Sequence, residues 1–292
     1  MISAQIGIGL SFVAMLCWGF GDFLIQKSAR KIGDWEALFF ITLFGAVILA
    51  PFAYKNAIAA LAGSGEELLV LALLCVILFF AAMLDFEALR VGKLAVIEPI
   101  WSFEVPVAAV LSFFILFERI DLAQTILIVA LLVGLAFVSL RKKFDFKKLL
   151  LERGTLLAFF GAVMMGAANF FMGWSSRLSD PLVANFISDL FIALVTGVVL
   201  IATGKFHKTV RDISTNKSVL IPMSVADKAA WVAYAFAMSL APIAVATALS
   251  ESYIIIAVML GLVINHERLE YHQKAGLALA VMSALVLAAI TR

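Results

Sequence analysis

Long apolar runs separated by short polar connections cover nearly the whole chain. A helix needs about 20 consecutive apolar residues to cross the hydrocarbon core of a bilayer, and ten runs of this kind are present. They lie at residues 4–27, 35–54, 67–89, 94–117, 121–140, 154–176, 182–203, 218–239, 243–264 and 271–290. The pattern therefore predicts an all-α integral membrane protein with ten transmembrane helices.

The composition supports a membrane protein with several spans. Hydrophobic residues make up 64% of the chain and charged residues only 14%, whereas soluble domains carry about 25% charged residues. The chain lacks a strongly basic region of the kind that binds nucleic acid. Cys17 and Cys75 are expected to be small buried side chains within apolar runs. No basic segment precedes the first run, which favours a retained span over a cleaved signal peptide.

Polar residues recur in the same order in the two halves of the chain. Gly19, Phe23, Ser28 and Arg30 match Gly166, Phe170, Ser175 and Arg177, and Glu118, Arg119 and Gln124 match Glu267, Arg268 and Gln273. We predict two repeats, residues 1–148 and 149–292, that form one membrane domain. Each repeat holds an odd number of spans, so the second must be inverted relative to the first. Many alternating-access carriers are built this way and bind substrate near the midplane, between the repeats.

Basic residues are concentrated in the loops that follow odd-numbered spans. The loops after even-numbered spans hold only Lys55, Arg119 and Arg177. Because Lys and Arg accumulate in cytoplasmic loops, this asymmetry predicts cytoplasmic odd-numbered loops, with both chain termini outside.

The segment 94–117 carries two acids and two prolines inside an apolar run. Glu98, Trp101 and Glu104 follow one another at equal steps that place them on one broad side of a helix. A carboxylate at the bilayer centre costs about 2.5–3.5 kcal/mol, and Pro99 and Pro106 each remove a backbone donor. We expect such a segment to line a polar cavity; for Glu98, water at the nearby loop is an alternative explanation.

Polar and aromatic residues also interrupt the first and ninth spans. Trp18 and Asp22 are one turn apart and share a helix face. Glu251 and Tyr253 are the repeat counterparts of the Glu104 region. We predict that all four line the same cavity, with Glu251 able to pair across the pseudo-two-fold axis. For Asp22 the alternative is a structural carboxylate satisfied by a neighbouring helix.

The seventh and eighth spans offer further charged groups. Lys228, next to Asp227 in the middle of the eighth span, is a natural partner for a carboxylate of segment 94–117, and a purely structural ion pair is an equal alternative. Asn185 and Asp189 share a face that either joins helices or binds ligand. Asp85, near the end of the third span, is interpreted as an interfacial charge with basic neighbours.

These residues together resemble the drug/metabolite transporter superfamily, in its EamA-type ten-helix branch. The resemblance is carried by Trp18-Gly19-Phe20-Gly21 with Lys27, by Glu98 through Pro106, by Phe117-Glu118-Arg119-Ile120, and by Ser250-Glu251-Ser252-Tyr253 and His266-Glu267-Arg268-Leu269. It implies a secondary carrier whose central cavity is formed mainly by helices 1, 3, 4, 6, 8 and 9. It also implies cytoplasmic termini, opposite to the loop charges. Ile255 stands where the family pattern leads us to expect a second-half proline.

The predicted cavity is more acidic than basic, which favours a cation or an amine-bearing zwitterion, with aromatic faces available for cation–π contacts. The predicted substrate-binding residues are Trp18, Asp22, Glu98, Trp101, Glu104, Asp227, Lys228, Glu251 and Tyr253. A carboxyl group that loses water becomes easier to protonate, so Glu104 and Glu251 are candidates for proton coupling. We predict a multi-pass secondary transporter of the cell membrane that carries amino acids, amines or related small metabolites by alternating access.

Motifs of other membrane functions are missing from the sequence. It has no P-loop for ATP hydrolysis, no HExxH or GxSxG motif, and its 3 histidines lack metal-ligand spacing. We expect no enzyme activity, no cofactor and no metal. Two alternative functions remain open. The first is a channel or passive facilitator with the same repeats, and the second is an intramembrane enzyme that uses a carboxylate pair. The oligomeric state stays open, a homodimer included.

Overall fold

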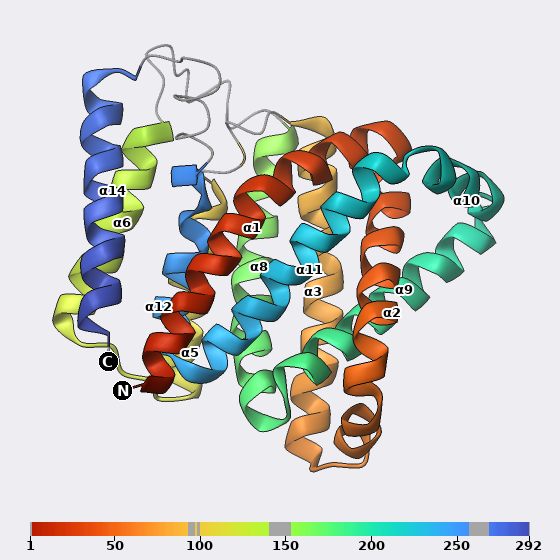
Figure 1. The fold of residues 1–292 in the computed structure, drawn as a ribbon, viewed down its shortest axis with the longest axis horizontal. Helices are drawn as coiled ribbons and strands as arrows, with labels where there is room; N and C mark the ends of the chain where they lie inside the picture. Colours follow the sequence, from red (N-terminus) through yellow and green to blue (C-terminus); the bar gives the residue numbers. More distant parts are fainter. Residues whose placement is uncertain (1, 93–96, 98–99, 140–152, 257–268, 292) are drawn as a thin grey trace.

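The computed structural model describes residues 2–92, 97, 100–139, 153–256 and 269–291, and these residues form a bundle of helices (Figure 1). The long helices are α1 (Ile2–Ile32), α2 (Asp34–Leu61), α3 (Gly65–Val91), α6 (Leu122–Ser139), α8 (Arg153–Leu178), α9 (Pro181–Ala202), α11 (Lys217–Leu240) and α14 (Tyr271–Ile290). The shorter elements are α5 (Glu104–Ile115), α10 (Phe206–Thr215), α12 (Ile243–Ser250) and the 3₁₀ turn η1 (Glu251–Tyr253).

The expectation of ten helical spans is met only in part. Within the described residues, 8 helices are long and apolar enough to cross a membrane, and the segments 104–115 and 243–256 form shorter apolar helices. The fourth and ninth predicted spans are therefore interrupted where they are described. The polar stretch Lys205–Lys217, which we expected to be a connection, contains the additional helix α10.

Capping residues and one glycine allow very short connections between the helices. Gly33, at φ 111°, joins α1 to α2 in a conformation that side-chain-bearing residues rarely adopt. The Ser64 hydroxyl accepts from the Glu67 backbone N–H at the start of α3, and Asp180 caps α9 ahead of Pro181. These side chains satisfy N–H groups that a helix leaves without an internal partner in its first turn.

Helix packing follows a two-fold pattern that exchanges the halves of the chain. The most extensive contacts join α1 to α11 and α3 to α8, which are equivalent pairs under the repeat, and α2 to α9 and α6 to α14, which pair each helix with its own counterpart. The chain termini lie at the same end of the bundle (Figure 1). This arrangement supports two inverted repeats packed around a common centre, although the predicted boundary at residues 148 and 149 lies outside the described residues.

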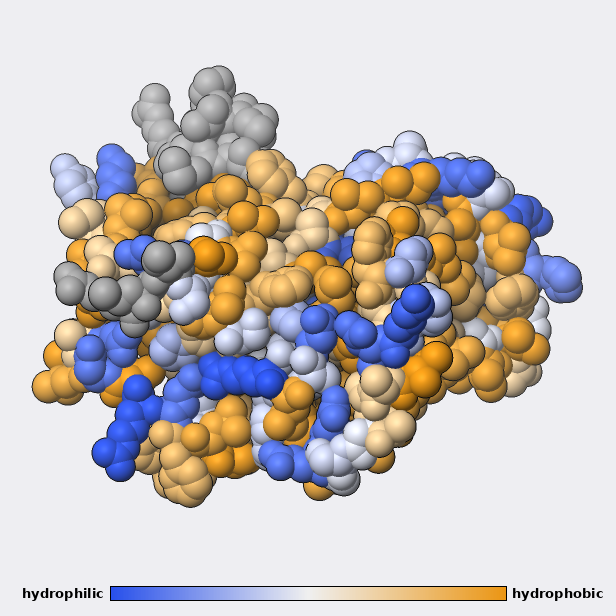
Figure 2. Space-filling view, turned by 60° about the horizontal axis from the view of Figure 1, so that its bottom comes forward, coloured by the Kyte–Doolittle hydropathy of each residue, from blue (hydrophilic) through white to orange (hydrophobic). Residues whose placement is uncertain are grey.

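The outer surface is largely apolar, as a membrane-embedded bundle requires. Figure 2 shows broad hydrophobic areas interrupted by smaller hydrophilic patches, and many large apolar side chains of α2, α5 and α6 are exposed. A soluble monomer rarely exposes contiguous apolar area of this extent. We therefore interpret this surface as the lipid-facing side.

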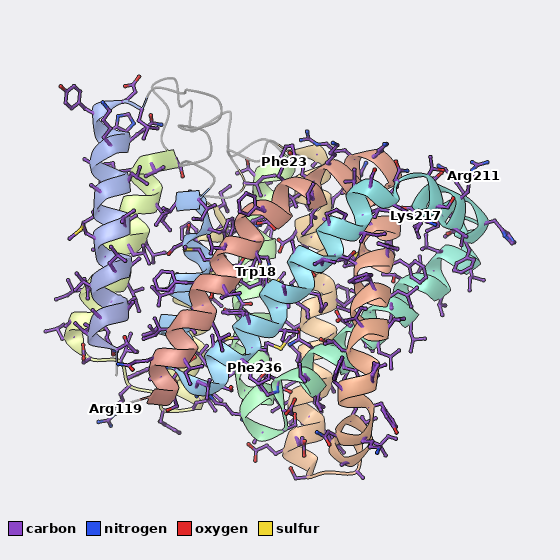
Figure 3. All side chains as sticks on the ribbon, in the orientation of Figure 1. Trp18, Phe23, Arg119, Arg211, Lys217 and Phe236 are labelled. Carbon is purple, nitrogen blue, oxygen red and sulfur yellow. The ribbon has the colours of Figure 1, made fainter. Side chains whose placement is uncertain are left out.

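Charged side chains mark the two ends of the bundle differently. Arg211 and Lys217 lie near the end opposite the termini, whereas Arg119 lies near the termini (Figure 3). We call the first the basic-loop end and the second the terminus end. The loop charges predict that the basic-loop end is cytoplasmic.

Candidate functional site

A single central cavity collects side chains from both repeats. It holds about 870 Å³ of empty space, including its opening to solvent. Its polar and aromatic lining consists of Trp18, Asp22, Thr42, Asp85, Trp101, Glu104, Asn169, Asn185, Ser188, Asp189, Asp227, Lys228, Trp231, Glu251 and Tyr253. All six spans expected from the family resemblance contribute to this lining. The second and seventh spans, α2 and α9, contribute as well. A cavity of this size is typical of a small-molecule site, and its lining is unusually rich in charged groups.

The fourth span breaks at the cavity wall. The backbone around Ser102 and Phe103 forms a tight turn, in which the Phe103 N–H donates to the Ile100 carbonyl oxygen at 3.1 Å. A new helix, α5, then begins at Glu104. Pro106 falls in the first turn of α5, where backbone N–H groups have no intrahelical acceptor, so its missing donor costs no hydrogen bond there. The proline thus favours a restart of the helix rather than a kink within it.

The ninth span breaks at the equivalent position without a proline. Residues Glu251–Tyr253 form a 3₁₀ turn between α12 and the residues that follow. The Ser252 hydroxyl donates to the Ala248 carbonyl oxygen at 2.7 Å, and the Thr247 hydroxyl donates to the Ile243 carbonyl oxygen at 2.8 Å. Hydroxyls that bond back onto carbonyls one turn earlier compete with the helix and bend it. The helix is thus interrupted here although Ile255 stands where a proline was expected.

These two breaks bring three carboxylates together, which we call the acid cluster: Asp85, Glu104 and Glu251. Their side chains are 7%, 4% and 6% exposed. Glu251 is an electrostatic neighbour of both of the others, and no basic side chain is among their described electrostatic neighbours. Asn169 donates from Nδ2 to Glu104 Oε2 at 2.9 Å, and the Trp101 indole lies beside Asp85. The cluster is therefore acidic and mostly shielded from water.

A second charged group, the paired cluster, consists of Asp189, Asp227 and Lys228. Lys228 Nζ lies 2.5 Å from Asp189 Oδ2, with both side chains under a tenth exposed. Asp227 interacts with the same ammonium and with the neighbouring Asp189. Gly45 of α2 closes this cluster from one side: a Cβ there would collide with Asp189 Oδ2 and Lys228 Cε. The missing side chain of Gly45 is what lets the ion pair fit between α2, α9 and α11.

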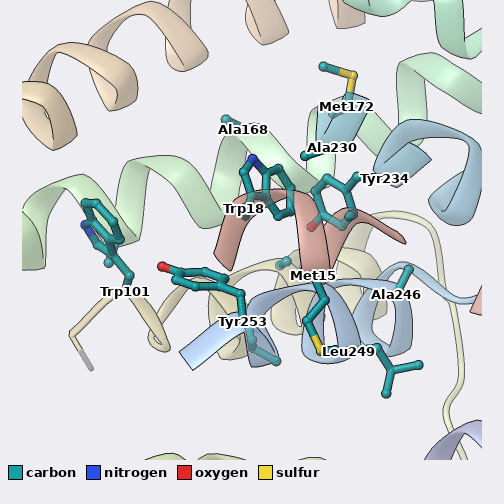
Figure 4. Packing of buried hydrophobic residues seen from close by; sticks show 14 of the residues in the cluster. Met15, Trp18, Trp101, Ala168, Met172, Ala230, Tyr234, Ala246, Leu249 and Tyr253 are labelled. Atoms are coloured by element: carbon teal, nitrogen blue, oxygen red, sulfur yellow. The ribbon is translucent and has the colours of Figure 1, made fainter. Parts of the chain in front are cut away.

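Aromatic rings cover the space between the helices. Trp18 packs edge to face against Tyr234, with ring centroids 5.1 Å apart (Figure 4), and against Trp231 at 5.4 Å. Trp101 and Tyr253, from the two broken segments, also line the cavity. The Tyr234 hydroxyl donates to Thr247 Oγ1 at 2.7 Å, which ties α11 to α12 next to the break.

The terminus end is closed by a network around Arg177 at the end of α8. Arg177 Nη2 lies 2.8 Å from Glu118 Oε1, and its guanidinium also donates to the Met238 and Ala241 carbonyl oxygens at 2.9 Å. Glu118 in turn accepts from the Ile243 backbone N–H at 2.9 Å, at the start of α12. Glu118 thus caps the start of α12, and its repeat counterpart Glu267 lies outside the described residues.

The cavity extends furthest towards the basic-loop end. Along α3 its lining reaches Leu89, in the last turn of the helix, whereas along α11 it ends at Trp231, more than two turns before Leu240. The cavity lining thus stops short of the terminus end, where the Arg177 network joins α8, α11 and α12.

Eight of the nine predicted substrate-binding residues line this one cavity. They are Trp18, Asp22, Trp101, Glu104, Asp227, Lys228, Glu251 and Tyr253, while Glu98 lies outside the described residues. Their role in substrate binding stays a prediction. Among the described residues, no group of three His, Cys, Asp or Glu side chains is arranged to hold a metal ion.

One interpretation from the sequence is wrong, and a second fails for Glu104. Asp85 is not an interfacial charge, because it is buried against α8, where a Cβ at Gly161 would collide with Asp85 Oδ1. Its neighbour Glu87 does pair with Arg90, at 2.6 Å. The expected pairing of Lys228 with a carboxylate of segment 94–117 does not hold for Glu104, which bonds to Asn169 while Lys228 pairs with Asp189.

Asn169 and Trp231 were missed as lining residues. A signal for Asn169 was available, because it is the repeat counterpart of Asp22. Trp231 follows Asp227 by one helical turn, so the spacing that linked Trp18 to Asp22 also applied there. Asp189, left open between a structural and a ligand role, proves to be the partner of Lys228.

Comparison with known families identifies the chain. Residues 5–140 and 152–289 each match the model of the EamA-like transporter family. The chain belongs to the EamA-like transporter family. It is thus a multi-pass membrane transporter of the drug/metabolite transporter superfamily, and the two matched segments correspond to the two repeats.

A solved structure gives independent support for the fold. Its title reads "Crystal structure of protein"; it shares 17% sequence identity with this EamA-like transporter, with a TM-score of 0.69 over 98% of this chain and 97% of the other. At this level of identity the likeness shows the fold alone. A search among curated proteins gives no match.

Proposed function

We propose that this EamA-like transporter is a proton-coupled secondary carrier of the cell membrane that moves small amines or amine-bearing zwitterions, amino acids included, by alternating access. The observation that carries the proposal is the acid cluster, in which three buried carboxylates meet at the two helix breaks of the cavity. Buried charges of one sign require compensation from elsewhere. A proton or a cationic substrate group supplies it.

The position of the cluster supports coupling between substrate and proton. Glu104 and Glu251 lie in broken segments that belong to different repeats, and each lines the cavity. A group that protonates at such a site changes the charge balance exactly where a cationic substrate would compete with the proton. Mutually exclusive binding of proton and cation gives exchange across the membrane when the carrier changes its open side only with one of them bound.

The closed terminus end favours a carrier over a channel. The Arg177 network seals this end while the cavity extends towards the other. A channel would need a continuous path in one conformation, whereas a carrier needs one closed end at a time.

Transport in proteoliposomes tests the proposal. We expect a proton gradient to drive accumulation of a labelled amine, and we expect Glu104→Gln and Glu251→Gln each to lower gradient-driven accumulation at least tenfold. Glu66→Gln, at an exposed position at the start of α3, is the matched control. Saturable counterflow separates the carrier from a pore. Uptake that ignores the proton gradient and survives both substitutions would refute proton coupling through this cluster.

A further inference from the structure

The cavity holds far more acids than bases. Its described lining contains one basic side chain, Lys228, and six acidic ones: Asp22, Asp85, Glu104, Asp189, Asp227 and Glu251. Protonation of some carboxylates reduces the negative charge but adds no cation that could receive an anionic group of a ligand. The binding of a carboxylate-bearing substrate therefore depends on whether Lys228 is available.

Lys228 already has two carboxylates beside its ammonium. Its ammonium lies 2.5 Å from Asp189 Oδ2, and Asp227 is a second carboxylate beside the same charge. The backbone of α2 at Gly45 lies against both Asp189 and Lys228, so the pair has little room to separate. A ligand carboxylate would have to share this one ammonium with Asp189 and Asp227, which adds a further negative charge to a buried group that is already acidic and is therefore unfavourable.

The two amide side chains of the site are directed at an acid and at a backbone carbonyl. Asn169 Nδ2 donates to Glu104, and Asn185 Nδ2 donates to the Pro181 carbonyl oxygen at 2.9 Å. The N-terminus of α5, where a helix would attract an anion, begins with Glu104 itself. These arrangements leave little to recognise a carboxylate.

The remaining lining suits a cation with an apolar body. Trp18, Trp101, Trp231 and Tyr253 offer aromatic faces next to the carboxylates. An ammonium group gains from both kinds of neighbour, through charge and through cation–π contact.

We propose that the substrate of this carrier is an organic amine without a free carboxylate, and that the Asp189–Lys228 pair is the device that excludes amino acids. The inference rests on the proposed function and narrows it. It predicts that the transporter accepts an amine and rejects the amino acid with the same side chain. Tryptamine and tryptophan form such a pair, as do cadaverine and lysine.

Competition experiments on the full chain in proteoliposomes test the inference. With labelled tryptamine as the transported probe, we expect tryptamine, cadaverine and agmatine to compete at concentrations at least tenfold lower than tryptophan, lysine and arginine. Competition by the amino acids at equal or lower concentration would overturn the inference while leaving an amine and amino acid carrier intact. If no amine or amino acid is transported, the proposed function itself fails.

Two variants test the role of the ion pair. Asp189→Asn combined with Asp227→Asn frees Lys228, and we expect the preference for amine over amino acid to shrink at least tenfold. Asp189→Asn combined with Lys228→Gln removes the pair without freeing a cation, and the preference should remain. An unchanged preference in the first variant, once its folding is verified by size-exclusion chromatography, would show that the pair does not exclude carboxylates. If the first variant does not fold, the wild-type competition data alone decide.

Discussion

In the paired cluster, Asp189 and Asp227 share the ammonium of Lys228, whereas in the acid cluster Asp85, Glu104 and Glu251 lie together with no basic side chain among their described neighbours. Both groups line the same cavity and both are almost completely buried. The first group carries its own neutralising charge and can act as fixed architecture. The second must obtain positive charge from a proton or a substrate, and this requirement is what makes it a candidate for the transport chemistry.

Removing the cation of the paired cluster should have the largest effect on stability. Lys228→Met leaves two buried carboxylates uncompensated, and breaking a buried pair costs about 3–5 kcal/mol. Thermal unfolding in nanodiscs should show a large fall in Tm, partly restored by adding Asp189→Asn. Lys208→Met, at an exposed position on α10, is the control. A fall in Tm no larger than that of the control would mean that Lys228 does not stabilise the paired cluster by neutralising its two acids.

Opening the terminus end should change which side of the membrane reaches the acid cluster. Arg177→Gln removes the charged donor of two backbone carbonyls and of Glu118, and we expect a loss of about 2 kcal/mol. We also expect a cysteine placed at Met238 to react faster with a thiol reagent added at the terminus end. Arg119→Gln, which changes an exposed neighbouring charge, should alter neither reading. Unchanged labelling would exclude Arg177 as part of the seal.

Two glycines allow the walls of the clusters to be compared directly. Gly45→Ala would push against the Asp189–Lys228 pair, and Gly161→Ala against Asp85. Overpacking costs about 1–3 kcal/mol, and we expect the larger loss at Gly45 because its neighbours are held together by an ion pair. Gly161→Ala should instead mainly lower transport. The control is Gly9→Ala, since nothing lies within 4 Å of a Cβ there. Equal losses of stability at both walls would argue against a difference in rigidity.

Phe117 offers the smallest test, in the turn that positions Glu118. Its φ of 54° is rare for a bulky residue. Phe117→Gly removes the steric cost of this conformation but adds backbone entropy to the unfolded chain, so a net gain of about 0.5 kcal/mol is expected. Chemical denaturation measures it. Destabilisation instead would mean that the exposed Phe117 ring makes contacts that outweigh its strained backbone.

The spans and the repeat could be read from the sequence because they depend on local properties. Hydropathy over about 20 residues predicts a span whatever packs against it, and the repeated Glu-Arg pairs and Gly and Arg positions carry the internal symmetry. The helical period likewise predicts that Trp18 and Asp22 share a face. For the same reason most residues chosen from the interrupted spans do line the cavity.

The exceptions all concern partners that are distant in the chain. The burial of Asp85 depends on Gly161 of α8, and nothing around Asp85 in the sequence reports it. The partner of Lys228 is likewise Asp189 of another helix, and not a carboxylate of segment 94–117 that the sequence could suggest.

The sequence by itself determined that this protein is a helical membrane transporter with two repeats and an acidic interior, since polarity and periodicity decide whether a segment enters the bilayer and which face it buries. Only the tertiary structure decided which acid meets the cation. Lys228 pairs with Asp189 because α9 and α11 approach across Gly45, and Glu104, Glu251 and Asp85 are left together. Coulomb energy depends on the distance between charges in space, and that distance is a property of the packed helices.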